Sequence, residues 1–298
     1  MMFSGLHLLL TYKCNFECDH CFVYSHPHAK GVMRISDVRE ILNEAERLGT
    51  VKWIYFEGGE PFLYYQTMLW GLREAKRKGF RTGIVTNSYW ATSVEDAREW
   101  LLPISEIGID DLSISDDSFH YSETDENLAK YAHKVAIELG IPVGTITIED
   151  PQKNLKEIKW KGKPVIAGSV QFKGRAVEKL TDGLPRKPWT EFDDCPDEDF
   201  TNPGRVHIDP FGYVHLCQGI ALGNMRKTPL HELIADYDPN THPICAPLLQ
   251  GGPAELVKKY AVKHEEDYID ACHLCYSARL KLRDRFPEIL APDGIYGV

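Results

Sequence analysis

The chain of 298 residues is 43% apolar and 26% charged, which is an ordinary globular composition and leaves enough apolar residues for a sizeable core. Its formal net charge of −10 argues against a nucleic-acid backbone or an acidic membrane surface as partner. No stretch reaches the roughly 18 apolar residues of a membrane helix, and the N-terminus lacks a signal-peptide pattern, so we expect a cytoplasmic protein.

Short β-rich runs alternate with amphipathic helical patterns up to about residue 171. Strands are expected at 5–12, 51–57, 81–86, 109–115, 143–148 and 164–171. Helices are expected between them, the first with Ser36 as N-cap, the third opening on a Thr92–Glu95 capping box, and a short fifth around 152–160. Repeated β–α units predict an α/β fold with a parallel sheet and right-handed crossovers. Six units are too few for a closed eight-stranded barrel.

Three cysteines, Cys14, Cys18 and Cys21, follow the first expected strand with the spacing C-x3-C-x2-C. A [4Fe–4S] cubane takes one external ligand per iron, usually a cysteine thiolate, so three cysteines would leave one iron open to a non-protein ligand. The alternatives are a zinc knuckle or thiols that are merely buried. Zinc sites usually have four ligands in paired spacings, which favours the cluster.

A second motif, Gly58-Gly59-Glu60-Pro61, follows the second expected strand. Glycines let the backbone approach a ligand closely, and a carboxylate suits an ammonium group. Taken alone, the motif is more typical of an ordinary Gly-Gly turn. Its presence in the same chain as the cysteine triplet favours a ligand-binding role over an ordinary turn.

Together the two motifs resemble the radical S-adenosylmethionine (SAM) enzymes. The resemblance implies a partial (β/α)6 TIM-like barrel, with SAM chelated to the open iron. Cleavage of SAM would give a 5′-deoxyadenosyl radical, and a low-potential donor such as a flavodoxin or ferredoxin is also implied. It further implies a SAM site that includes the Gly58–Pro61 motif, the residues His20, Phe22, Asn87, Ser113, Ser115 and Asp116, and Arg175.

Polar residues at the ends of the expected strands are further candidates, because barrel chemistry takes place at the carboxyl ends of the strands. Oxidation of an alcohol needs a base, and His120, Asp117 and Glu149 are the candidates by position. Thr147, Gln171 and Lys173 are candidates for contacts with SAM or substrate. Each residue has an ordinary alternative as a loop or helix cap.

Of the remaining cysteines, Cys195 lies within a stretch rich in Pro, Asp and Lys, and the others follow it. We expect a radical SAM barrel over residues 1–176, a linker over 177–203 and a small cysteine-rich α+β unit over 204–298. A short hairpin is expected over 205–217, with its turn at 209–212. The region around Gly212 and Cys217 resembles the SPASM and twitch extensions of radical SAM enzymes. It departs from the full SPASM pattern, because no C-x5-C-x3-C run follows Cys275.

The shorter twitch arrangement implies a second, auxiliary [4Fe–4S] cluster. Its ligands would be Cys195, supplied from the linker, with Cys217, Cys272 and Cys275, which leaves Cys245 over. Four thiolates close every iron of such a cluster. Structural zinc is the competing interpretation, because four cysteines also hold zinc.

Three functions follow from these patterns. The four-cysteine layout resembles that of a twitch-type dehydrogenase of an inositol amine, which favours oxidation of a small alcohol- or sugar-like molecule with the auxiliary cluster as electron acceptor. The second is a maturase of ribosomally made peptides, whose basic leader would suit the acidic chain. The third, a non-enzymatic iron–sulfur or zinc scaffold, predicts no SAM binding.

Overall fold

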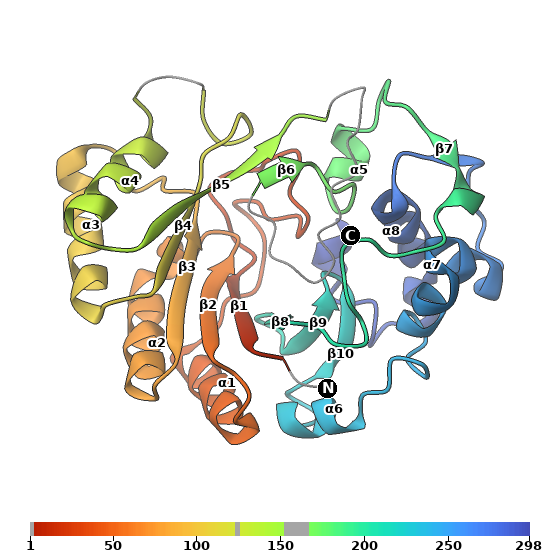
Figure 1. Cartoon of the computed structure of the whole chain (residues 1–298), viewed down its shortest axis with the longest axis horizontal. Coiled ribbons are helices and arrows are strands. Elements are labelled where there is room, and N and C mark those ends of the chain that lie inside the picture. The colour runs from red at the N-terminus through yellow and green to blue at the C-terminus, as the bar shows by residue number, and fades with distance from the viewer. Residues whose placement is uncertain (1–2, 123–125, 152–166) are drawn as a thin grey trace.

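The structure is a computed structural model that describes residues 3–122, 126–151 and 167–298 (Figure 1). Its main feature is a nine-stranded sheet with the order β10-β9-β8-β1-β2-β3-β4-β5-β6. Strand β8 and strands β1 to β6 run parallel, and β9 is antiparallel to both of its neighbours. The strands are β1 (Gly5–Thr11), β2 (Trp53–Gly58), β3 (Arg81–Thr86), β4 (Asp111–Ser115), β5 (Val143–Glu149), β6 (Ala167–Ser169), β8 (Arg205–Ile208), β9 (Tyr213–Cys217) and β10 (Ile220–Asn224).

The predicted α/β class and parallel strand order are confirmed. Among the strands that the structure describes, the sheet does not close, because β6 and β10 are its two edges, and this is the partial barrel expected from the strand count. Strand β6 ends at Ser169, two residues before the predicted end, and residues 164–166 of the predicted strand lie outside the described residues. The helix expected around 152–160 lies outside them as well.

Four helices follow the first strands: α1 (Ile35–Leu48), α2 (Tyr65–Arg77), α3 (Val94–Ile107) and α4 (Leu128–Glu138). Figure 1 shows them along the outside of β1 to β5. Leu6, Leu8 and Leu10 of β1 are fully buried and belong to the same core as Val38 and Ile41 of α1. Because side chains alternate across a strand, His7 lies on the opposite, inner face of the sheet.

Two predicted helix starts were wrong. The N-cap of α1 is Arg34 rather than Ser36, and its backbone N–H donates to the Asp37 carboxylate at 2.7 Å. The cap of α3 is Ser93, whose hydroxyl oxygen accepts the Asp96 backbone N–H at 3.0 Å, one residue later than the expected Thr92. In both cases adjacent polar residues offer alternative caps, and the local geometry decides between them.

The C-terminal part joins the main sheet. Strands β8 and β9 form the predicted hairpin, and the Gly212 N–H donates to the Asp209 carbonyl at 3.0 Å across its turn. Within the predicted linker, β7 (Lys187–Pro188) pairs with β11 (Asp267–Tyr268), so this segment packs on the C-terminal elements. The linker and domain bounds stay a prediction. The remaining elements are α5 (Ala176–Lys179), β7 (Lys187–Pro188), α6 (Leu230–Asp236), α7 (Cys245–Tyr260), β11 (Asp267–Tyr268) and α8 (Ala271–Leu282), with 3₁₀ turns at Pro61–Tyr64, Trp189–Glu191, Arg283–Arg285 and Asp293–Tyr296.

A bilayer-spanning helix needs roughly 20 apolar residues. None of the helices in the described ranges meets that requirement of length and apolarity.

Candidate functional site

The loop that leaves β1 carries the three clustered cysteines. Cys14 is buried, whereas Cys18 and Cys21 are half-buried. Backbone N–H groups already point at the sulfurs: the Phe16 N–H lies 3.4 Å from Cys14 Sγ, and the Ser25 N–H lies 3.3 Å from Cys21 Sγ. Such N–H groups favour a thiolate over a thiol.

The thiols interact electrostatically with one another. Burial raises the pKa of Cys14 to about 12, and the nearby Glu60 and Cys21 add to the effect. Burial also raises the pKa of Cys18 above its usual range, with contributions from Cys21 and Cys14. The thiol is therefore the stable form of Cys14 and Cys18 in the empty loop, and a bound metal must displace their protons. Three mutually close thiols on one loop fit a cluster with three protein ligands.

The Gly58–Pro61 motif packs directly on this loop. A Cβ atom at Gly58 would lie 2.4 Å from the Thr11 carbonyl oxygen, and one at Gly59 would lie 2.1 Å from the Lys13 carbonyl oxygen. The Gly59 N–H donates to the Thr11 carbonyl at 2.6 Å. The two glycines therefore allow the end of β2 to approach the backbone of the cysteine loop. From the sequence, the same glycines were expected to allow close approach of a ligand.

Glu60 ties strand ends together. Its carboxylate accepts the Thr86 hydroxyl at 2.9 Å and the backbone N–H groups of Asn87 and Phe62 at 2.8 and 3.0 Å. Burial raises the pKa of Glu60 to about 7, although these three hydrogen bonds oppose the rise. The carboxylate is fully buried and engaged by protein groups, so its predicted contact with the SAM amino group stays a prediction.

Asn87 and Arg175 fix the loop from two sides. The Asn87 side-chain amide donates to the side-chain oxygen Oδ1 of Asn15 at 3.0 Å and lies 3.5 Å from Cys14 Sγ. The Arg175 guanidinium donates to the carbonyl oxygens of Cys18 and Ser25 at 2.8 and 2.7 Å. Both residues were predicted to contact SAM, and in the structure both act as braces of the cysteine loop.

His20, Asp117 and His120 lie together beside the cysteine loop, with one potential ligand atom from each within 4.8 Å of the others. His120 Nδ1 lies 2.7 Å from the Asp117 carboxylate, and the His20 ring lies 4.5 Å from the ring of Phe119. Burial raises the pKa of Asp117, but the hydrogen bond and charge of His120 outweigh it and the pKa is lowered overall. Burial lowers the pKa of His20 to about 4. The cluster is therefore a carboxylate beside two imidazoles, of which that of His20 is neutral at pH 7.

The other predicted site residues are more dispersed. The Ser113 hydroxyl donates to Asp111 at 2.8 Å, and the Asp116 carboxylate accepts the side-chain amide of Asn127, the cap of α4. Asp116 therefore serves the helix start. Glu149 is exposed at the end of β5, whereas His120 is half-buried. The remaining predicted residues are half-buried Ser115 and Thr147, Pro61 at the start of a 3₁₀ turn, exposed Phe22, and half-buried Gln171, which donates to Asp197.

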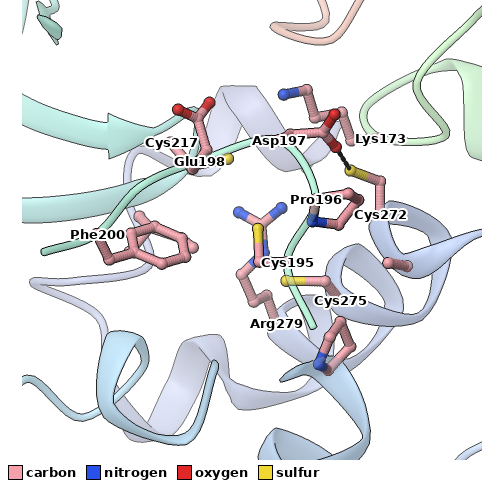
Figure 2. Close-up of a pocket in the computed structure, with 13 residues that line it drawn as sticks. Lys173, Cys195, Pro196, Asp197, Glu198, Phe200, Cys217, Cys272, Cys275 and Arg279 are labelled. Atoms are coloured by element: carbon pink, nitrogen blue, oxygen red, sulfur yellow. Dashed lines mark hydrogen bonds between the residues drawn. The ribbon is translucent and has the colours of Figure 1, made fainter. Parts of the chain in front are cut away.

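The four C-terminal cysteines line one cavity. Figure 2 shows Cys195 from the segment before β8, Cys217 from the end of β9, and Cys272 and Cys275 from the first turns of α8 around this space. Cys272 Sγ donates to the Asp197 carboxylate at 2.9 Å. Burial raises the pKa of Cys195, Cys217 and Cys272. Four thiols that line one cavity, two of them buried and two half-buried, fit a metal centre closed on every side by sulfur, either iron–sulfur or zinc.

Two buried cations share the lining of this cavity. Lys173 is 4% exposed and Arg279 is 1% exposed, and both face the cavity with Asp197 and Glu198. Although burial opposes it, the charges of Cys217, Cys272, Glu198 and Asp197 raise the pKa of Lys173 above its usual range. The cations offset the negative charge that four thiolates would bring into a buried space. Cys245 begins α7 and is fully buried, outside the residues that line the cavity.

Sequence reasoning missed several of these residues. Arg279 stands four residues after Cys275 on α8, a spacing that puts both on one helix face, and Asp197 stands two residues after Cys195. Lys173 was expected near SAM or substrate and instead lines the C-terminal cavity. His7 is a polar residue within an otherwise apolar strand, and such a residue is a sequence signal for a polar group on the inner face of the sheet.

Comparison with known proteins identifies the family. A sequence profile of the radical SAM superfamily matches residues 8–159, which is half of the chain. The chain belongs to the radical SAM superfamily. Members of this superfamily use a [4Fe–4S] cluster and SAM for radical chemistry, so the chain is a radical SAM enzyme. The residues that fit the cluster are Cys14, Cys18 and Cys21.

Individual relatives cover only parts of the chain. The peptide biosynthesis protein YydG of Bacillus subtilis (strain 168) is 26% identical over 149 residues, 49% of this chain and 46% of that protein. A protein of Pyrococcus furiosus that modifies the cofactor of tungsten-containing aldehyde ferredoxin oxidoreductase is 33% identical over 132 residues, 44% of this chain and 35% of that protein. The chain thus spans less than half the length of either relative. Among solved structures, BtrN in complex with AdoMet and 2-DOIA is 16% identical, with 78% of this chain and 82% of that chain covered and a TM-score of 0.49.

Proposed function

We propose that this radical SAM enzyme oxidises a hydroxyl-bearing small molecule and passes the released electron to an auxiliary [4Fe–4S] cluster. The observation that carries the proposal is the convergence of Cys195, Cys217, Cys272 and Cys275 on one buried cavity that also holds two cations. A cluster closed by four thiolates cannot bind substrate, so electron transfer is the chemistry left to it.

When bound, the first cluster and SAM supply the hydrogen-abstracting radical, and the chain supplies position and proton transfer. Arg175, Asn87 and Gly59 hold the cysteine loop at the carboxyl ends of β1 to β3. His120, hydrogen-bonded to Asp117, is the proposed acceptor of the hydroxyl proton, because the carboxylate would stabilise the imidazolium that forms.

Metal analysis of the anaerobically reconstituted protein tests the proposal. We expect about eight irons per chain, falling to about four in the Cys272→Ala/Cys275→Ala variant, because each cubane holds four irons. About four irons with one zinc, and loss of that zinc in the variant, would refute the auxiliary cluster and point to redox-neutral chemistry.

Modification of a ribosomally made peptide is the second candidate. It is supported by the similarity to YydG, a protein named for peptide biosynthesis. The two candidates differ in substrate, so incubation with polyols and amino sugars, and in parallel with any short peptide encoded beside the gene, separates them. The readout is 5′-deoxyadenosine formed above the level seen without substrate.

The role of His120 in alcohol oxidation has its own test. If His120 accepts the hydroxyl proton, His120→Asn should lower the yield of oxidised product more than the yield of 5′-deoxyadenosine.

A further inference from the structure

A second group of potential metal ligands lies on the inner face of the sheet, apart from all the cysteines. His7, Glu57 and His207 come from the three adjacent strands β1, β2 and β8. His7 Nδ1 lies 3.1 Å from Glu57 Oε2, and His207 Nε2 lies 3.1 Å from Glu57 Oε1. One ligand atom from each residue falls within 4.8 Å of the other two.

The His207 ring lacks a complete set of hydrogen-bond partners among the described residues. Its Nε2 faces the Glu57 carboxylate and also lies 3.5 Å from the side-chain nitrogen of Gln218. The orientation of Gln218 is set by Lys173, whose ammonium donates to the Gln218 oxygen at 3.2 Å. A proton on His207 Nε2 would therefore point toward an amide donor as well as toward Glu57.

The other tautomer of His207 fits no better. His207 Nδ1 is buried and has no hydrogen-bond partner in the part of the chain that the structure describes. A proton placed there would be an unpaired buried donor, and Nε2 would then turn a bare lone pair toward a carboxylate. In either tautomer Nδ1 has no partner among the described residues, whereas a cation bound to both Nε2 and Glu57 would remove the conflict at Nε2.

We propose that His7, Glu57 and His207 bind a divalent transition-metal ion of the zinc type. Two imidazole nitrogens and one carboxylate oxygen are a ligand set that such ions take, with one or more positions left for water or substrate. The ligands are held rigidly, because they project from neighbouring strands and the His7 ring stacks on Tyr55 at 4.6 Å. Glu57 retains 15% side-chain exposure, compared with 7% for His207, so the open positions would face the inner side of the sheet at Glu57.

Charge permits a cation here. Glu57 is the carboxylate of the group and lies 3.1 Å from each of the two imidazoles. Two cations are close by: Lys173 lies beyond the Gln218 amide and near Asp197 and Glu198, and Arg205, two residues before His207 on β8, has a guanidinium nitrogen 3.9 Å from the Glu198 carboxylate. The Lys173 ammonium does not contact the group directly. The inner face thus offers an anionic site separated from that ammonium by an amide group.

The test uses the cluster-reconstituted protein and zinc sulfate under anaerobic conditions. After desalting we expect about one additional zinc per chain, and its X-ray absorption should show nitrogen and oxygen ligands at about 2.0–2.1 Å rather than sulfur at about 2.3 Å. Because the ligand type is read from the unaltered protein, this result does not depend on the folding of any variant. A zinc held by the C-terminal cysteines instead would give a sulfur shell, so failure of the auxiliary-cluster proposal is distinguishable.

Variants then locate the zinc. Glu57→Gln and His207→Gln should each weaken zinc binding at least tenfold, measured by competition with a fluorescent chelator. His28→Gln, the same substitution at an exposed histidine, should bind zinc as the unaltered protein does. A spectrum with sulfur ligands only, no retained zinc, or unchanged affinity in Glu57→Gln and His207→Gln would overturn the proposal.

Discussion

Replacement of Arg175 by methionine tests whether this residue braces the cysteine loop. The side chain is 4% exposed and lies over the Tyr24 ring, with its guanidinium carbon 5.1 Å from the ring centroid. It gives one hydrogen bond to the Cys18 carbonyl and one to the Ser25 carbonyl. Methionine keeps an apolar stem of similar length and removes both donors.

The magnitude follows from those two bonds. A hydrogen bond to a charged group contributes about 1.5–3 kcal/mol, so loss of two of them costs at least about 3 kcal/mol. The free energy of opening the cysteine loop falls by the same amount, so the equilibrium constant for opening rises roughly 100-fold. If the first cluster is lost through this opening, iron should leave Arg175→Met roughly 100-fold faster.

The assay is the rate at which a strong iron chelator bleaches the cluster absorbance of the reconstituted Cys272→Ala/Cys275→Ala protein, which should carry only the first cluster. Arg175→Lys should be intermediate, because an ammonium keeps the charge but not the planar fork that reaches two carbonyls. Arg77→Met, at a surface arginine paired with Glu74, is the matched control and should lose iron at the unaltered rate. Iron loss from Arg175→Met at the unaltered rate would refute the bracing role.

Three further predictions follow from the same geometry. Gly59→Ala should abolish incorporation of the first cluster, because the new Cβ would lie 2.1 Å from the Lys13 carbonyl oxygen. The control is Gly144→Ala, whose Cβ would meet nothing within 4 Å and which should keep its iron. Equal iron content in the two variants would contradict the prediction. Burial raises the pKa of Asp270 to about 7, so its stabilising contribution is complete below about pH 4 and is lost as the pH rises through 7. Urea unfolding of cluster-free Asp270→Asn at pH 5 and pH 8 should therefore show a smaller fall in stability than the unaltered chain, by about 3 kcal/mol for the two pH units between 5 and 7, and an identical fall would exclude the effect. Lys173→Met removes a buried cation beside Cys217 and Cys272 and should lower the midpoint potential of an auxiliary cluster in an EPR-monitored titration, so an unchanged potential would argue against electrostatic tuning.

Local sequence patterns predicted the strands and the cysteine sets, because period-two burial and ligand spacing are properties of short segments. They did not predict the bracing by Arg175, which joins residues 157 and 150 positions apart in the chain. The glycines of the Gly58–Pro61 motif were assigned to a ligand, since the sequence cannot show that the carbonyls of Thr11 and Lys13 occupy that side.

The inner-face group was missed for the same reason. His7, Glu57 and His207 are single polar residues in three strands, and only the β8–β1–β2 pairing brings them together. The helix starts at Arg34 and Ser93 were misplaced because neighbouring polar residues have similar capping propensities, so sequence alone does not choose between them.

The pairing of β1 with β8 also sets an order of events during synthesis. Gly5 pairs with Arg205, so one edge of the first strand has no partner until about 200 more residues have been made. At roughly 5–20 residues per second, translation of that length takes on the order of 10 to 40 seconds. During this interval an apolar parallel strand, adjoining the loop with Cys14, Cys18 and Cys21, presents an open edge to other chains. A nascent chain of this protein therefore has most need of a chaperone before Ile208 leaves the ribosome.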